Sequence, residues 1–147
     1  RIRDRFSGLH KALAASSQEI VTTVVDSGLR GRGGAAFPTG IKWQTVHDAP
    51  SDKKYIVCNA DEGDSGTFAD RLVMECDPFM LIEGMIIAGL AVGSDEGYIY
   101  LRSEYPVADE ILQEAIAIAT KEGYLGNNIC GSERAFNLEV RLGAEAY

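Results

Sequence analysis

The sequence predicts an α/β fold in which helices and a glycine-rich loop precede a mainly parallel sheet. Three strands are expected, over residues 54–58, 97–102 and 135–142, with helical segments between them that begin at Pro78 and Pro106. Two consecutive β-α-β units imply parallel strands joined by right-handed crossovers. The carboxyl ends of the three strands then share one edge, where open α/β sheets bind their ligands.

A helix with a clear start signal comes first. Ser16-Ser17-Gln18-Glu19 is typical of a capping box, in which Glu19 reaches back to the start of the helix. Apolar residues at helical spacing follow, and Gly28 ends the pattern. The β-branched residues of this segment also permit a strand over residues 18–27, so both structures stay open at this point.

Residues 28–43 contain five glycines and two arginines and are the most informative segment of the chain. So many glycines let the backbone approach a ligand closely, and the arginines indicate an anion, most simply a phosphate. The pattern Gly31-x-Gly33-x-x-Ala36 has the letters of a dinucleotide fingerprint. That fingerprint requires a strand before it, whereas we expect a helix. After the loop, Pro38 suits the first turn of a short helix that extends through Val46.

A polar segment follows the first predicted strand, with an amide and four carboxylates at Asn59, Asp61, Glu62, Asp64 and Asp70. Such a cluster could bind a metal, but an EF-hand is excluded because Gly63 and Leu72 occupy ligand positions. Carboxylate and amide oxygens also accept hydrogen bonds from the hydroxyls of a ribose or a ribityl chain. A solvated acidic turn is the third interpretation.

Composition excludes several classes of function. The net charge of −8 argues against nucleic-acid binding, and no apolar run is long enough to span a membrane. Cys58, Cys76 and Cys130 have no metal-binding spacing, so we expect buried thiols in a reducing compartment. Neither His10 nor His47 has a partner that suggests a catalytic triad. If the protein is an enzyme, a cofactor carries its chemistry.

Six segments together resemble a known family. They are Ser27-Gly-Leu-Arg-Gly-Arg-Gly-Gly34, Phe37-Pro-Thr-Gly-Ile-Lys-Trp43, Cys58-Asn-Ala-Asp-Glu62, Gly66-Thr-Phe-Ala-Asp-Arg71, Leu81-Ile-Glu-Gly-Met85 and Gly97-Tyr-Ile-Tyr100. In this order they resemble the FMN-binding, NADH-oxidising 51 kDa-type subunit of respiratory complex I. The same family includes the diaphorase subunits of NAD-dependent formate dehydrogenases and NAD-reducing hydrogenases. The resemblance implies a Rossmann-like three-layer domain that transfers hydride between NAD(H) and FMN.

The resemblance also implies the residues of the site. Those that line the nucleotide site are Gly31, Arg32, Gly33, Gly34 and Lys42. Those that hold the ribityl and phosphate region of FMN are Asn59, Asp61 and Glu62. Three more follow by similarity: Phe37 at the dinucleotide, Asp64 at the nicotinamide end and Tyr147 in the last FMN-site segment. No residue is expected to be catalytic itself, and no metal ligand is expected.

Three departures from the family's pattern bear on the expected nicotinamide contact and on the branch of the family. Ala36 stands where the family often has Gly, Asp64-Ser65 where it often has Glu-Pro, and Thr45 where respiratory members can carry an aromatic residue. The shorter Asp64 side chain makes a direct contact with the nicotinamide less secure. Asp64-Ser65 and Arg102-Ser-Glu-Tyr-Pro106 resemble the formate dehydrogenase branch more than the respiratory one, with complex I and an NAD-reducing hydrogenase as the alternatives.

The chain starts at Arg1 and stops before the family's Cys-Gly-Glu-Glu segment. We therefore expect residues 1–147 to be the N-terminal part of the FMN/NADH-binding domain. By resemblance, a ubiquitin-like domain and a helical domain with a four-iron four-sulfur cluster lie in the missing C-terminal part. The expected partners are other subunits of a cytoplasmic electron-transfer complex, including a 24 kDa-type iron–sulfur subunit.

Two functions of other classes remain open. One is a catalytically silent fragment or assembly scaffold, because the missing segment completes the pocket. The other is a dehydrogenase fragment that uses NAD without flavin, which a strand over residues 18–27 would favour and a helix there would disfavour.

Overall fold

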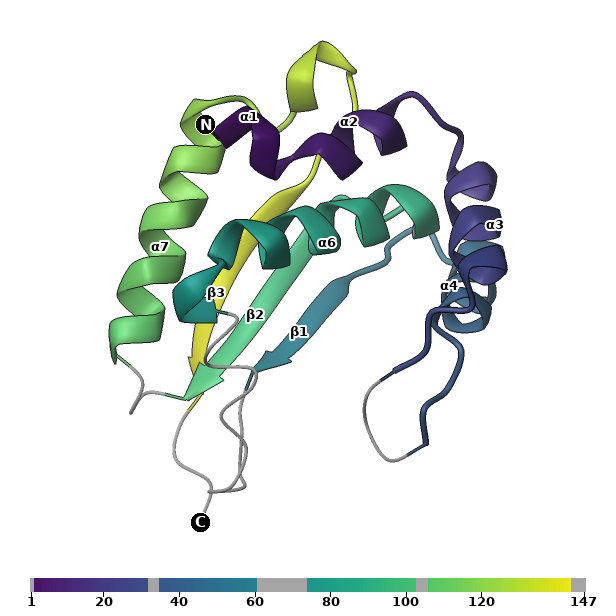
Figure 1. Ribbon diagram of the computed structural model, residues 1–147, viewed down its shortest axis with the longest axis horizontal. Helices are drawn as coiled ribbons and strands as arrows, with labels where there is room; N and C mark the ends of the chain where they lie inside the picture. Colours follow the sequence, from purple (N-terminus) through teal and green to yellow (C-terminus); the bar gives the residue numbers. More distant parts are fainter. Residues whose placement is uncertain (1, 32–34, 61–73, 103–105, 144–147) are drawn as a thin grey trace.

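The computed structural model describes residues 2–31, 35–60, 74–102 and 106–143, and its centre is a three-stranded parallel sheet. The strands β1 (Ile56–Ala60), β2 (Glu96–Arg102) and β3 (Asn137–Gly143) lie side by side in that order. Helix α6 (Pro78–Val92) lies between β1 and β2 in the chain, and α7 (Pro106–Lys121) lies between β2 and β3 (Figure 1). The predicted α/β fold with a parallel sheet is confirmed.

Within the described residues, helices cover one face of this sheet. Cys58, Ile99 and Val140 are register partners on the covered face, and Ile99 is fully buried. Helix α6 lies across this face, and α7 packs against β3 (Figure 1). The neighbouring positions Val57 and Tyr98 point the other way, and 55% of Val57 is exposed. The described residues therefore form two of the three predicted layers.

Helix α6 is the centre of the hydrophobic core. Asp77 caps it by accepting a hydrogen bond from the Met80 N–H (3.2 Å), and Pro78 occupies its first turn. Ile82 and Ile86 are fully buried, and each such side chain contributes about 1.5–3 kcal/mol through burial. The helix is apolar on most of its circumference because it packs against the sheet on one side and against other helices around it.

Two short helices, α1 (Ile2–Arg5) and α2 (Ser7–Leu13), pack against α6. Between them Phe6 is fully buried and stacks on Tyr124, with ring centroids 4.2 Å apart. The Leu9 N–H donates a hydrogen bond to the Glu83 carboxylate (3.0 Å). A 3-10 turn, η1 (Ile129–Gly131), precedes β3. Together these contacts cover the side of α6 that faces α1 and α2.

Helices α3 (Ser17–Ser27) and α4 (Thr39–Asp48) form a hairpin at one side of the sheet (Figure 1). The predicted capping box is confirmed: Ser16 and Glu19 bond each other's backbone N–H at 3.1 and 2.8 Å. Gly28 ends α3 in the left-handed conformation (φ 73°). Residues 18–27 are therefore helical. Pro38 is the cap of α4 rather than its first residue.

Three expectations were wrong in detail. The first strand spans Ile56–Ala60, not residues 54–58, because its register is set by pairing with β2 from Ile56 onward. The sequence of residues 54–58 is typical of a short buried strand, but among the described residues β1 is an edge strand with one exposed face. The third strand begins at Asn137, two residues later than predicted.

The expectation of buried cysteines is also wrong, because two of the three are exposed and the third is only half-buried. Cys130 is exposed because Ile129, not Cys130, faces the core in the 3-10 turn η1, and its backbone is left-handed (φ 52°). Cys76 is exposed just before the Asp77 cap of α6, and Cys58 is half-buried on β1. Burial of the thiols therefore follows local chain geometry rather than residue type.

Candidate functional site

The glycine-rich loop is held at its base by two backbone hydrogen bonds. The Gly31 N–H donates to the Phe37 carbonyl (2.9 Å), and the Thr39 N–H donates to the Leu29 carbonyl (2.9 Å). We call this pair of bonds the clasp. It joins the chain leaving α3 to the chain entering α4 in an antiparallel bridge. The glycine-rich loop thus connects the two helices of the α3–α4 hairpin, which spans residues 17–48.

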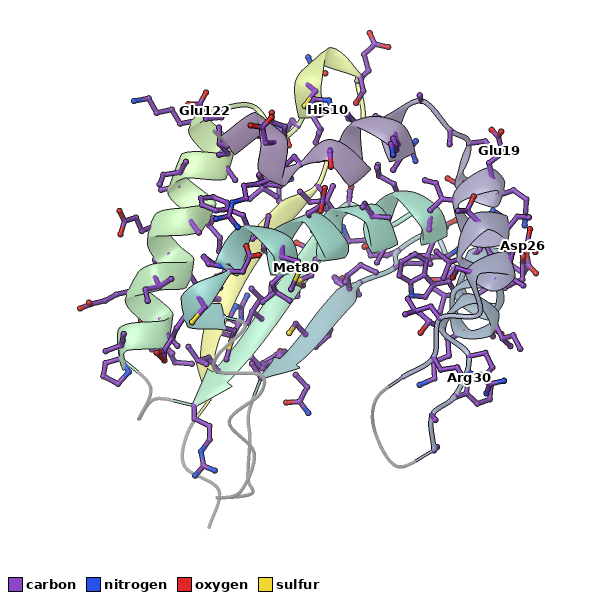
Figure 2. The ribbon with its side chains drawn as sticks, viewed as in Figure 1. His10, Glu19, Asp26, Arg30, Met80 and Glu122 are labelled. Atoms are coloured by element: carbon purple, nitrogen blue, oxygen red, sulfur yellow. The ribbon has the colours of Figure 1, made fainter. Side chains whose placement is uncertain are left out.

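An aromatic ring and a cation lie together beside the clasp. Phe37 is 44% exposed, and the Lys42 Nζ lies 5.5 Å from the centre of its ring. On the other side of the clasp, the Arg30 guanidinium donates to the Ala36 carbonyl (3.2 Å). Figure 2 shows Arg30 at the loop end of the hairpin, with Glu19 at its other end. An exposed ring beside an ammonium group can stack on a planar ring and neutralise a phosphate.

Ala36, one of the three departures from the family's pattern, has a left-handed backbone (φ 45°). That conformation costs a residue with a side chain roughly 1–2 kcal/mol more than glycine. The chain therefore stores strain at the loop where the family often has glycine.

Asn59 lies at the carboxyl end of β1, on the face of the sheet that the described helices leave open. It is exposed, and its register partner on β2 is Tyr100, which is 43% exposed. The described ends of the glycine-rich loop and the carboxyl ends of the strands lie at the same end of the molecule (Figure 1). An amide at this position can both donate to and accept from a polyol.

The structure thus describes Gly31, Phe37, Lys42 and Asn59 of the predicted site. The first three are brought together on the hairpin, and Asn59 lies on the sheet. The remaining predicted site residues lie outside the described residues: Arg32, Gly33, Gly34, Asp61, Glu62, Asp64 and Tyr147. Among the described residues, no group of three or more His, Cys, Asp or Glu could hold a metal ion.

A cavity of about 240 Å³ lies at the opposite end of the sheet, by the amino ends of the strands. Cations beside it are already engaged with α6. The Lys54 Nζ donates to the Val92 and His47 carbonyls (both 3.1 Å), and Arg134 donates to the Leu90 carbonyl (3.0 Å). Cations in this position satisfy the last carbonyls of a helix. Lys54 and Arg134 thus stabilise the end of α6, and we do not assign a ligand to this cavity.

The described pKa shifts near the hairpin also have structural causes. The backbone N–H of Ser16 lowers the pKa of Glu19. A hydrogen bond from His47 lowers the pKa of Asp48, with a further contribution from Gln44. Both carboxylates are exposed and belong to helix ends, so neither marks a catalytic acid or base.

One glycine of the hairpin carries a constraint that sequence reasoning missed. Gly40 is buried in the first turn of α4, against the backbone of Val25 in α3. Its only sequence signal is an isolated glycine inside a helical pattern.

Comparison with known proteins identifies the family. Residues 24–147 match the family model described as the Nuo51 FMN-binding domain. The chain belongs to this family. Other members are similar along nearly the whole chain. A subunit of the NADH-quinone oxidoreductase of Aquifex aeolicus is 50% identical over 142 residues, which cover 97% of this chain and 33% of that protein.

Hydrogenase subunits match this chain as well. The NADP-reducing hydrogenase subunit HndC of Solidesulfovibrio fructosivorans is 49% identical, over 97% of this chain and 29% of its own length. The crystal structure of an NAD+-reducing nickel–iron hydrogenase in the H2-reduced state matches with a TM-score of 0.76 and 40% identity. That match covers 92% of this chain and 22% of the hydrogenase chain. The chain thus spans about a third or less of the relatives it matches.

No helix among the described residues combines the length and the apolar character that crossing a membrane requires.

Proposed function

We propose that the protein is the flavoprotein subunit of an NADH-oxidising complex, and that residues 1–147 form the N-terminal part of its FMN/NADH-binding domain. The observation that carries this proposal is the family match over residues 24–147, in a chain whose glycine-rich loop and strand ends lie at one end of the molecule. FMN, when bound, would exchange a hydride with the nicotinamide and pass electrons on singly.

The hairpin would supply the dinucleotide side of the site. Phe37 offers an exposed ring for stacking, and Lys42 offers a positive charge 5.5 Å from that ring. Backbone N–H groups of the loop and the Arg32 guanidinium would bind phosphate, with Gly31, Gly33 and Gly34 allowing close approach. These donor types fit a dinucleotide.

The sheet edge would supply the flavin side. Asn59, at the exposed end of β1, would bond the ribityl chain together with Asp61 and Glu62, which follow in the sequence. Asp64 would face the nicotinamide end, and Tyr147 would complete the flavin contacts. The acceptors match the hydroxyls of a ribityl chain in type. NAD(H) is thus the proposed substrate and FMN the proposed cofactor.

The proposed context is an NAD-dependent formate dehydrogenase, on the strength of Asp64-Ser65 and residues 102–106. Complex I and an NAD-reducing hydrogenase are the alternatives. The relatives described above are subunits of an NADH-quinone oxidoreductase, an NADP-reducing hydrogenase and an NAD+-reducing hydrogenase. In each case the subunit would be cytoplasmic, and a 24 kDa-type iron–sulfur subunit would be a partner. A four-iron four-sulfur cluster would lie in the rest of the subunit.

Anaerobic addition of NADH to the full-length protein tests the proposal. We expect the protein to purify with flavin, and we expect the flavin absorbance to bleach on addition of NADH. Purification without flavin, or a flavin that NADH does not bleach, would contradict the proposal.

The two other classes of function can be separated from it. Titration of FMN into the 147-residue chain distinguishes a silent fragment, since tight and saturable quenching of the flavin fluorescence would rule out that function. A strand at residues 18–27 would favour a dehydrogenase that uses NAD without flavin, and the helix α3 (Ser17–Ser27) counts against that function.

A further inference from the structure

We propose that Gly40 is a positioning residue for the dinucleotide side of the site. Its missing side chain lets α4 approach the backbone of α3, and this approach sets the geometry of the clasp beside Phe37 and Lys42. The inference rests on the proposed function for its consequence in NADH binding, while the structural part stands on the hairpin alone.

The approach of the two helices leaves no room for a side chain. A Cβ atom at Gly40 would lie 2.5 Å from the Val25 Cγ2 and 2.6 Å from both the Val25 Cα and the Val25 backbone nitrogen. Two of these three atoms belong to the backbone, so a change of rotamer cannot relieve the overlap. Any residue with a Cβ therefore requires α4 to move away from α3.

The clasp is adjacent to this contact on both helices. Thr39, the neighbour of Gly40, donates to the Leu29 carbonyl (2.9 Å), and Gly31 donates to the Phe37 carbonyl (2.9 Å). The Val25 carbonyl accepts from the Gly28 N–H (3.1 Å), which ends α3. A displacement of about 1 Å would stretch the clasp beyond normal hydrogen-bond length.

The other end of the hairpin is fixed to α6, so the displacement should appear at the loop. The Ser17 hydroxyl at the start of α3 donates to the Leu90 carbonyl (2.7 Å). Lys54 joins the His47 carbonyl, in the last turn of α4, to the Val92 carbonyl at the end of α6. With these ends held, separation at Gly40 opens the clasp rather than shifting the whole hairpin.

The consequence is selective for the dinucleotide. Phe37 and Lys42 flank Gly40 in sequence and would move with α4, whereas Asn59 lies on β1 and would stay in place. In the full-length protein, we expect Gly40→Ala to raise the KM for NADH tenfold or more. Its kcat and its FMN content should stay within about twofold of the parent, because Asn59 and the strand ends proposed for the flavin do not move with α4.

Two further variants isolate the mechanism. Gly84→Ala in α6 is the matched control, because Gly84 is exposed and no atom lies within 4 Å of the added Cβ. Adding Val25→Ala to Gly40→Ala should not rescue the KM, since the Val25 Cα and backbone nitrogen remain in place. Restoration of the KM by Val25→Ala would overturn the proposal.

Thr39→Pro tests the clasp without any overlap at Gly40. It deletes the N–H that donates to Leu29, at the first position of α4, where proline is well tolerated. We expect the same selective rise in the KM for NADH. An unchanged KM in both Thr39→Pro and Gly40→Ala would overturn the proposal, as would a parallel loss of FMN and NADH binding.

Hydrogen exchange separates this inference from the proposed function. Gly40→Ala should speed exchange at the Gly31 and Thr39 amides while leaving the amides of β2 unchanged. This result is expected even if the parent protein holds no flavin, in which case the proposed function alone would fail. Parent-like exchange at both hairpin amides would refute the positioning role directly.

Discussion

Lys42 and Phe37 place a positive charge and an exposed aromatic ring within 5.5 Å of each other on the hairpin. The two side chains come from opposite sides of the α4 cap, and Gly40 lies between them in the chain. Their proximity therefore depends on where α4 begins. Ala36, beside Phe37, has a left-handed backbone, which shows that the loop geometry is maintained at some cost.

At this scale we predict that Lys42→Met weakens NADH binding about tenfold, because the variant keeps the length of the side chain and removes its charge. Steady-state KM values at low and high salt check the prediction. The parent KM should rise with salt, and the KM of the variant should respond less. Lys121→Met, at an exposed position of α7, is the matched control. Equal KM values for Lys42→Met and the parent would remove Lys42 from the site.

At the scale of elements, α3 shows how local signals determine a helix. Its capping box and its end at Gly28 were both predicted from the sequence, because caps depend on residues within one turn. The order of strands and helices was predictable for a similar reason. The start of β1 was not, since it depends on which residues of β2 it pairs with.

The contacts that shape the site were also beyond local reasoning. Gly40 touches Val25 because two helices cross, and nothing near Gly40 in the sequence encodes that contact. The exposure of Cys130 depends on the turn η1, whose Cys130 N–H donates a hydrogen bond to the distant Gly123 carbonyl (2.8 Å). The site residues were predicted from the family resemblance. The contacts that hold Gly31, Phe37 and Lys42 in place are seen only in the structure.

The capping box predicts a pH dependence of stability. The bond from the Ser16 N–H lowers the pKa of Glu19 in the folded protein, so its contribution is fully present above the unfolded pKa. It is lost as the pH falls through the folded value. We expect Glu19→Gln to unfold at a lower denaturant concentration than the parent at about pH 6, and the difference should shrink toward about pH 3. A difference that grows on acidification would contradict this assignment.

The attachment of the hairpin to α6 predicts a stability difference between adjacent lysines. Lys54→Met removes a cation that bonds two carbonyls and should destabilise the protein by about 2 kcal/mol or more. Lys53→Met is the matched control, because Lys53 forms exposed ion pairs with Asp95 and Glu96 and should change little. Urea unfolding of both variants checks the prediction. Equal midpoints would show that the hairpin is not held by Lys54.

At the scale of the whole molecule, the residues proposed for the dinucleotide and those proposed for the flavin lie on two different elements. The hairpin carries the charge and ring proposed for the dinucleotide, and the sheet carries the amide proposed for the flavin. The loop end of the hairpin and the carboxyl ends of the strands lie at the same end of the molecule, and the cavity beside Lys54 and Arg134 lies by the amino ends of the strands. The central claim is that a single site is formed by two elements that are fixed to one core.

Hydrogen exchange of the full-length protein, with and without FMN and NADH, tests this claim most directly. We predict that the ligands together slow exchange at the hairpin, around Gly31 and Thr39, and at the end of β1, around Asn59. The segment that contains Lys53 and Lys54 should be unaffected. Protection at that amino-end cavity instead, or at only one of the two site elements, would contradict a single site built on both.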